Sequence, residues 1–278
     1  MPSGCAGRAP GPGTAELAER TVRLEREGDV AHVVLANPPL NLFGDGSFAE
    51  LSECITEVEG SDARALVWRA EGEIFSGGVD VNGFQRVVEA GPERASEFAA
   101  PLIETVRRLE ALEIPTLAIV HGLCLTAGLE VALGCDMIWA SESARFGLVE
   151  AVVGLTPGAG GTQRIAERAG PARAREFVMT GGLYDAATLE RWNVVNRVVG
   201  DDELLEKATR FAGRLAAGPT IAHASTKRIV RAYLDRGIEG ADEITPDVFA
   251  GLFASEDLQA AVRTFIAEGP GNATFQGR

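Results

Sequence analysis

The hydrophobic pattern near the start of the chain predicts two strands, a helix and a third strand. Residues 21–39 alternate apolar and polar side chains and then run apolar, with Gly28-Asp29 between the two halves and Pro38-Pro39 at the end, which is typical of a β-hairpin. Apolar side chains recur at helical spacing within residues 47–60. The apolar run at residues 63–70 predicts a buried strand.

Strands and helices continue to alternate through the middle of the chain. After a turn-rich loop over residues 71–84, a helix is expected over residues 98–112, ending before Pro115. A strand, a helix and another strand are expected over residues 115–122, 127–135 and 136–140. These units recur about every 45 residues without sequence identity, which indicates a coiled α/β stack and not a tandem repeat.

The remainder of the chain is predominantly helical. Helices are expected over residues 162–169 and, starting at Pro171, up to Gly181-Gly182. From residue 202 onward the pattern is helical, with breaks at residues 218–219, 237 and 269–271. We therefore predict a disordered Gly/Pro-rich tail over residues 1–19, an α/β core over 20–205 and a C-terminal helical region over 206–278.

Composition narrows the class of protein. The chain has 278 residues and 46% hydrophobic side chains, which is sufficient for a sizeable core, and its formal net charge of −14 argues against a nucleic-acid surface. It lacks the roughly 18 successive apolar residues that a membrane helix needs, and its N-terminus does not resemble a secretory signal. Four cysteines without C-x-x-C pairing indicate reduced thiols, so we expect a soluble cytoplasmic protein without nucleic-acid or membrane partners.

The most conspicuous motif is the glycine-rich stretch GLTPGAGGTQR at residues 154–164. It lacks the third glycine of a dinucleotide fingerprint, and neither Lys207 nor Lys227 follows a glycine, as a P-loop requires. The chain also has no G-x-S-x-G elbow, and its three histidines have no metal-ligand spacing. We therefore expect no phosphate cradle, no metal site and no histidine base.

Two glutamates are the best candidates for proton transfer. Glu130 interrupts an otherwise apolar helical face, and Glu150 has apolar neighbours on both sides. Each of them either points outward alone or is buried for a purpose. Two buried carboxylates whose pKa values are pushed apart can supply a general acid and a general base near neutral pH.

Three motifs, in this order and spacing, resemble the crotonase superfamily of enoyl-CoA hydratases and isomerases. They are FSGGVDV, HGLCLTAGLEVALGCDMIWASESARFGLVE and GLTPGAGGTQR, and the resemblance runs from about residue 21 to residue 275. It implies a spiral of ββα units followed by C-terminal helices that assemble a homotrimer or a dimer of trimers. It also implies an acyl-CoA thioester substrate and no separate cofactor, because coenzyme A is part of the substrate.

The resemblance also implies a set of site residues. Glu130 and Glu150 match the glutamate pair of the hydratases, with Glu130 expected as base and Glu150 as acid. The backbone N–H groups of Val79 and Ala127 match the oxyanion hole, which stabilises a thioester enolate. The substrate-binding positions implied by the motifs are Ser76, Gly77, Gly78, Asp80, Val81 and Gly158, the last of these contacting the reacting water.

The implied reaction is addition of water across a trans-2-enoyl-CoA to give a 3-hydroxyacyl-CoA. The alternatives are a Δ3,Δ2-enoyl-CoA isomerase, which needs one carboxylate and no bound water, another crotonase-type lyase or hydrolase of acyl-CoA, and a non-catalytic acyl-CoA binder. Three departures from the family pattern stand out. Thr126-Ala127 replaces part of a Gly-Gly-Gly run, Val149 stands where a proline often precedes the second glutamate, and Ala267-Glu268 replaces basic residues near the C-terminus.

Overall fold

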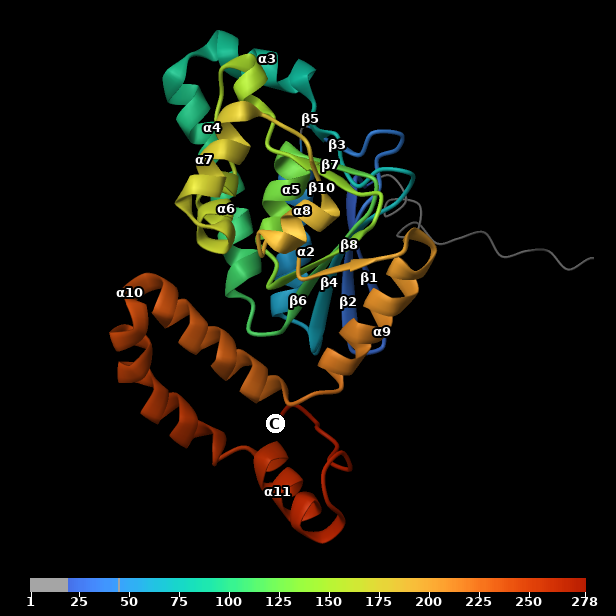
Figure 1. Cartoon of the computed structure of the whole chain (residues 1–278), viewed down its shortest axis with the longest axis vertical. Helices are drawn as coiled ribbons and strands as arrows, with labels where there is room; N and C mark the ends of the chain where they lie inside the picture. Colours follow the sequence, from blue (N-terminus) through green and yellow to red (C-terminus); the bar gives the residue numbers. More distant parts are fainter. Residues whose placement is uncertain (1–19, 45) are drawn as a thin grey trace, which may run out of the picture.

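A six-stranded sheet forms the centre of the computed structural model, which describes residues 20–44 and 46–278 (Figure 1). The strand order is β1-β2-β4-β6-β8-β11, and all neighbours are parallel except the β1–β2 hairpin. The strands are β1 (Val22–Glu27), β2 (Val30–Leu35), β4 (Ala65–Ala70), β6 (Thr116–Val120), β8 (Met137–Ser141) and β11 (Arg197–Val199). The expected hairpin is confirmed, and its turn contains Gly28 at a φ of +56°.

Two small sheets lie beyond the carboxyl ends of these strands. One has the order β10-β9-β7 and the other pairs β3 with β5. Their strands are β3 (Leu42–Phe43), β5 (Gly78–Val79), β7 (Leu123–Leu125), β9 (Arg145–Gly147) and β10 (Tyr184–Asp185). A bridge between Ser76 and Cys124 joins the two small sheets. This arrangement brings the expected oxyanion-hole segments next to each other.

The two faces of the main sheet are covered unequally. One face packs against several helices through Leu66 and Trp68 of β4, and the other packs against a single helix, α9, through Ala65 and Val67. The helices of the first face are α2 (Ser47–Glu59), α4 (Pro92–Ala111), α5 (Thr126–Leu133), α6 (Gly161–Ala169), α7 (Pro171–Thr180) and α8 (Ala186–Arg191). Because the central strands are covered on both faces, they are apolar runs without alternation.

Some elements differ from the expectations. Residues 81–84, expected in a loop, begin helix α3 (Val81–Ala90), because the Asp80 side chain accepts a hydrogen bond from the Asn82 N–H and caps the helix. Helix α4 begins at Pro92, earlier than expected, since proline is favoured in a first helical turn. The boundary expected at residue 205 falls inside α9 (Leu204–Ala216), whose apolar face is part of the core.

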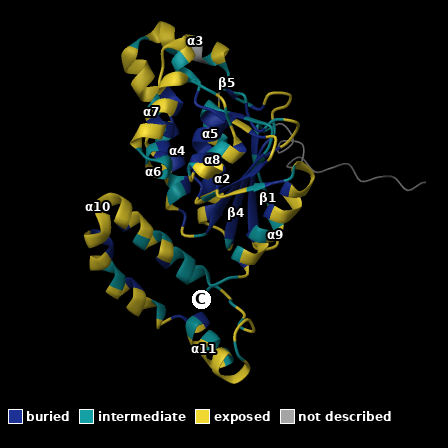
Figure 2. Ribbon diagram, viewed as in Figure 1, coloured by how far each residue is buried: buried dark blue, intermediate teal, exposed yellow. Residues whose placement is uncertain are grey.

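The C-terminal helices extend away from the sheet (Figure 1). They are α10 (Thr220–Leu252), which is interrupted by Gly237 at φ +71°, and α11 (Glu256–Glu268). The first half of α10 is tied to the core by Lys227, whose ammonium lies 2.8 Å from Asp136. Much of the remaining surface of both helices is exposed (Figure 2).

Residues 1–19, the expected disordered tail, lie outside the described residues. Within the described part of the chain, Cys54, Cys124 and Cys135 are free thiols in the core. None of the described helices combines the length and the apolar character needed to cross a membrane.

Candidate active site

Glu130 is a buried carboxylate on α5, the apolar helix that follows β7. Glu130 is only 3% exposed. Its Oε1 accepts hydrogen bonds from the backbone N–H groups of Ala159, at 2.8 Å, and Gly161, at 2.9 Å. The sequence left open whether Glu130 points outward or is buried. In the structure it is buried.

The glycine-rich stretch is the loop that closes over Glu130. Gly160 has a φ of +102°, which favours glycine, and Gly161 begins α6. A Cβ on Gly161 would lie 2.9 Å from the Glu130 Cγ, so glycine is needed there for the close approach. A Cβ on Gly158 would have no heavy atom within 4 Å, which leaves open space at the expected water position. Contact of Gly158 with water stays a prediction.

The pKa of Glu130 reflects opposing effects. Burial raises it above its ordinary value, while the N–H groups of Gly161 and Ala159 and the charge of Arg164 lower it, with a net upward direction. Every one of these opposing groups favours the ionised carboxylate. They offset part of the cost of burying the charge of Glu130.

Glu150 lies in the short 3-10 helix η1 (Glu150–Val153), just before the glycine loop. Its Oε2 is buried and has no hydrogen-bond partner among the described residues. Its pKa is raised to about 7 from an ordinary value of 4.5, by burial and then by the charge of the nearby Glu130, against a lowering by its own backbone N–H. Near neutral pH this carboxyl group is consequently poised between its acid and its ionised form.

The expected oxyanion-hole donors lie on two closely packed segments. The Asp80 N–H donates to the Phe43 carbonyl across the small sheet, so the preceding N–H, of Val79, points away from β3 because successive groups alternate along a strand. Ala127 is in the first turn of α5, where N–H groups have no intrahelical acceptor. The two donors fit the expected role, which stays a prediction.

Gly78 and Thr126 define how close these segments come. A Cβ on Gly78 would lie 1.9 Å from the Thr126 Oγ1, and Gly78 has a φ of +98°. Thr126 itself has a φ of +43°, rare for a residue with a side chain, and its hydroxyl is buried without a partner among the described residues. Thr126 thus fills the space that the usual glycine would leave against β5.

The other expected binding residues form one connected loop. The Ser76 hydroxyl donates to the Asn41 carbonyl and accepts from the Gly78 N–H. The Gly77 N–H donates to the Leu40 carbonyl. Val81 is exposed at the start of α3, next to the Asp80 cap. The internal hydrogen bonds hold this loop in shape, and direct substrate contact by its residues stays a prediction.

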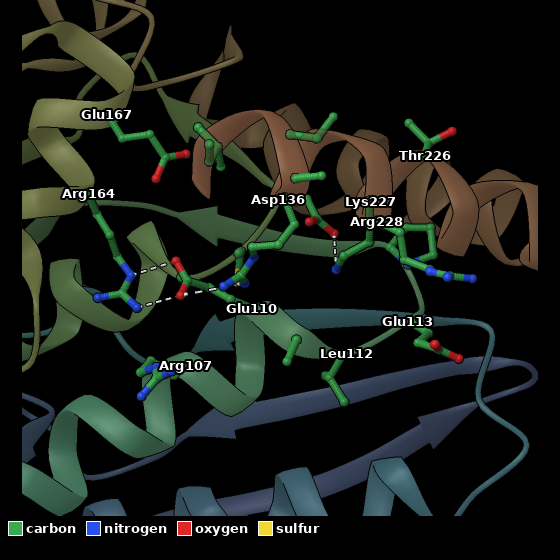
Figure 3. Close-up of a pocket in the computed structure, with 18 of the residues that line it drawn as sticks. Arg107, Glu110, Leu112, Glu113, Asp136, Arg164, Glu167, Thr226, Lys227 and Arg228 are labelled. Atoms are coloured by element: carbon green, nitrogen blue, oxygen red, sulfur yellow. Dashed lines mark hydrogen bonds and ion pairs between the residues drawn. The ribbon is translucent and has the colours of Figure 1, made fainter. Parts of the chain in front are cut away.

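Sequence reasoning missed an ion pair behind the glycine loop. Arg164, in α6, is 5% exposed, and its Nε and Nη2 lie 2.7 and 2.5 Å from the two carboxylate oxygens of Glu110 in α4 (Figure 3). Arg164 was visible as the last residue of the GLTPGAGGTQR motif. Its partner is 54 residues away and carries no sequence signal.

The ion pair lines a groove of about 1110 Å³ between the core and α10. Figure 3 shows Arg164 and Glu110 facing each other in it, with Asp136 and Lys227 paired farther along. Glu130 and Glu150 do not line this groove. This groove is therefore separate from the two acid–base candidates, and the candidate active site is defined by the two carboxylates.

The family of the chain is decided by comparison with known proteins. The family model described as enoyl-CoA hydratase/isomerase matches residues 25–276. The chain belongs to this family. The expected membership and the crotonase-like α/β fold are thereby confirmed.

Individual members of the family align along most of the chain. The short-chain-enoyl-CoA hydratase of Clostridium acetobutylicum is 32% identical over 88% of this chain and 94% of its own length. The crotonyl-CoA hydratase of Syntrophomonas wolfei is 30% identical over 92% and 98%. The solved structure of enoyl-CoA hydratase subunit I from Geobacillus kaustophilus HTA426 has a TM-score of 0.85, 33% identity, and coverage of 93% and 98%.

Proposed function

We propose that this enzyme adds water across the double bond of a trans-2-enoyl-CoA to give a 3-hydroxyacyl-CoA. The observation that carries the proposal is the pair of unlike carboxylates at one site. Glu130 accepts two backbone N–H donors, which favour its ionised form, and Glu150 has a pKa near neutrality and an unpartnered oxygen. Two carboxyl groups with different environments match the needs of a general base and a general acid.

The hydrogen bonds support an assignment of Glu130 as base and Glu150 as acid. Both N–H groups end on Oε1 of Glu130, so its second oxygen is the one that takes a proton from water as the water oxygen bonds to Cβ of the substrate. The π electrons of the double bond move toward Cα, which receives the proton of Glu150. The thioester oxygen gains negative charge during this step, and the N–H groups of Val79 and Ala127 are assigned to stabilise it, at about 3 kcal/mol per donor.

The reaction needs no metal or separate cofactor in this scheme, because side chains carry both proton transfers. Relatives named for short-chain and crotonyl-CoA substrates make crotonyl-CoA the first substrate to test. The free, buried thiols of Cys54, Cys124 and Cys135 support a reducing, cytoplasmic location.

We also propose a homotrimer or a dimer of trimers as the working assembly. Its support is the apolar surface left exposed on the two C-terminal helices, which a partner copy would cover. The exposed apolar side chains are Val230, Tyr233, Leu234, Ile238 and Phe249 of α10, Phe253 directly after it, and Val262, Phe265 and Ile266 of α11. Light scattering after size-exclusion chromatography tests this assembly, and a monomer at micromolar concentration contradicts it.

The test of function is loss of the conjugated thioester absorbance with a series of 2-enoyl-CoA esters, alongside 3-enoyl-CoA as the isomerase control. We expect hydration of crotonyl-CoA, and a drop of roughly a hundredfold or more in Glu130→Gln and in Glu150→Gln. Glu57→Gln, at an exposed position of α2, is the matched control and keeps wild-type turnover. Conversion of 3-enoyl esters alone would show the isomerase instead, and near-normal hydration in either active-site variant would refute the assignment.

A further inference from the structure

Arg164 contacts the same peptide group that holds Glu130. Its Nη1 donates to the Gly160 carbonyl oxygen at 3.1 Å and to the Ala159 carbonyl oxygen at 3.4 Å. The N–H of the peptide that joins Gly160 to Gly161 donates to Glu130. One peptide unit therefore lies between a guanidinium on its carbonyl side and a carboxylate on its N–H side.

The planarity of this peptide couples its two ends. In a trans peptide the C=O and the N–H are fixed in one plane and point in opposite directions. When Arg164 draws the Gly160 carbonyl toward itself, the Gly161 N–H is aimed the other way, at Glu130. The orientation of the donor is thus set by a side chain that does not reach the reacting atoms.

Glycine at position 160 makes this arrangement possible. Its φ of +102° is in the region that favours glycine, and a Cβ there would lie 2.1 Å from the Arg164 Nη1. The absence of a side chain at this position therefore gives the guanidinium access to the loop carbonyls.

Glu110 fixes the guanidinium in turn. The two-pronged contact uses Nε and Nη2, which leaves Nη1 directed at the loop. The other charged groups near the ion pair come from α5 and α10 and from α6 itself. They are Glu130 of α5, Arg231 of α10 at 4.0 Å from Glu110, Arg168 of α6, whose charge interacts with Glu110, and Glu167 of α6, which lines the groove (Figure 3). Glu130 itself faces Arg164 and Glu150.

We propose that Arg164, anchored by Glu110, is the positioning residue of the general base, orienting the Gly160–Gly161 peptide so that its N–H stabilises ionised Glu130. The proposal rests on the proposed function, in which Glu130 is the base. Arg164 also lowers the pKa of Glu130 through its charge. Loss of Arg164 therefore affects the ionisation of Glu130 as well as the orientation of the Gly161 N–H that contacts it.

Arg168, one turn later in the same helix, is a matched control. It also lies deep in the protein and donates to backbone carbonyls, those of Leu133, Cys135 and Val194, but it does not contact the glycine loop. Replacing Arg168 removes a comparable set of hydrogen bonds without touching Glu130. Any effect specific to the base is therefore absent from Arg168→Gln.

The experiment compares Arg164→Gln, Arg164→Lys, Glu110→Gln and Arg168→Gln by kcat, KM and the pH profile of kcat/KM with crotonyl-CoA. We expect Arg164→Gln to lower kcat by roughly 10- to 100-fold with little change in KM, and to move the acid limb of the profile upward by about one pH unit. The limb moves up because the base must be ionised and its anion has lost a stabilising cation. Glu110→Gln is expected to show the same changes to a smaller extent. The acid limb should move less in Arg164→Lys than in Arg164→Gln, because lysine keeps the positive charge.

Arg168→Gln is expected to lower the unfolding temperature while leaving the acid limb in place. An unmoved limb in Arg164→Gln, in a variant whose circular dichroism matches the wild type, overturns the positioning role. An equal limb shift in Arg168→Gln also overturns it. Full activity in Glu130→Gln would refute the proposed function itself, so the two failures are distinguishable.

Discussion

Replacing Glu150 with glutamine is expected to stabilise the protein at alkaline pH while abolishing most of its hydratase activity. The pKa of Glu150 is raised to about 7 from 4.5, chiefly by burial. The native state therefore keeps its proton between pH 4.5 and 7, where the unfolded chain has lost it. Stability falls with rising pH wherever the native state binds more protons, so wild type loses stability across this window and remains at the lower value above it.

The magnitude follows from the same pKa change. A tenfold change in an ionisation constant is worth about 1.4 kcal/mol, so the full difference corresponds to about 3 kcal/mol. Glu150 is partly exposed, and solvent screening reduces this to roughly 1–2 kcal/mol. Glutamine carries no charge at any pH in this range, and its neutral amide avoids the cost of an ionised, unpartnered carboxylate.

The assay is thermal unfolding of wild type and Glu150→Gln from pH 4.5 to 8.5 at one protein concentration, because assembly also affects the midpoint. The unfolding midpoint of Glu150→Gln minus that of wild type should increase by about 2–6 °C between pH 4.5 and 7 and stay constant at higher pH. Glu57→Gln controls for removal of an exposed charge. A difference that does not change with pH would refute the reasoning that Glu150 is protonated in the native protein near neutrality.

Three further changes test the geometry of the site. The kcat/KM for hydration should fall as the pH rises through about 7, because the general acid in η1 is then ionised, and a constant value from pH 6 to 9 contradicts its assignment. Gly161→Ala should lower kcat at least about tenfold because its Cβ meets the Glu130 Cγ, whereas Gly213→Ala, in α9 with open space around it, should leave kcat unchanged; equal kcat values for the two variants in steady-state assays would contradict this. Gly78→Ala should lower kcat by driving β5 from α5, and adding Thr126→Gly should restore part of it, since the Thr126 hydroxyl is the clashing atom; no recovery would argue against that contact.

The sequence was sufficient for features that depend on neighbouring residues. The β1–β2 hairpin follows from alternation and a turn at Gly28, and the break at Gly237 in α10 follows from the intrinsic preferences of glycine. The three motifs were sufficient to predict the family, because their order and spacing depend on the whole fold. Burial of Glu130 was left open, because a helical pattern with one interrupting charge fits both an exposed and an enclosed side chain.

Features that depend on contacts between distant segments could not be predicted. Glu110 and Arg164 meet because α4 and α6 pack on the same face of the sheet, which no local pattern encodes. Helix α3 was missed because it directly follows a turn-rich stretch and its residues are mostly exposed, although the apolar spacing of Val81, Phe84 and Val88 and the Asp80 cap were usable signals. Thr126 has a left-handed backbone conformation where it packs against Gly78. From the sequence alone a β-branched threonine predicts a negative φ instead.

The glycine loop explains why two identical side chains can take opposite roles. Its N–H groups converge on Glu130, and its carbonyls recruit the Arg164 guanidinium, so the loop lowers the free energy of one carboxylate anion from both directions. Glu150 lies before the loop and receives none of these donors, so burial alone controls most of its ionisation. The difference between base and acid therefore resides in which carboxylate the backbone faces. A change that turns the Gly160–Gly161 peptide should raise the pKa of Glu130 further and remove the donor that distinguishes it from Glu150, so Glu130 should lose its advantage as the base.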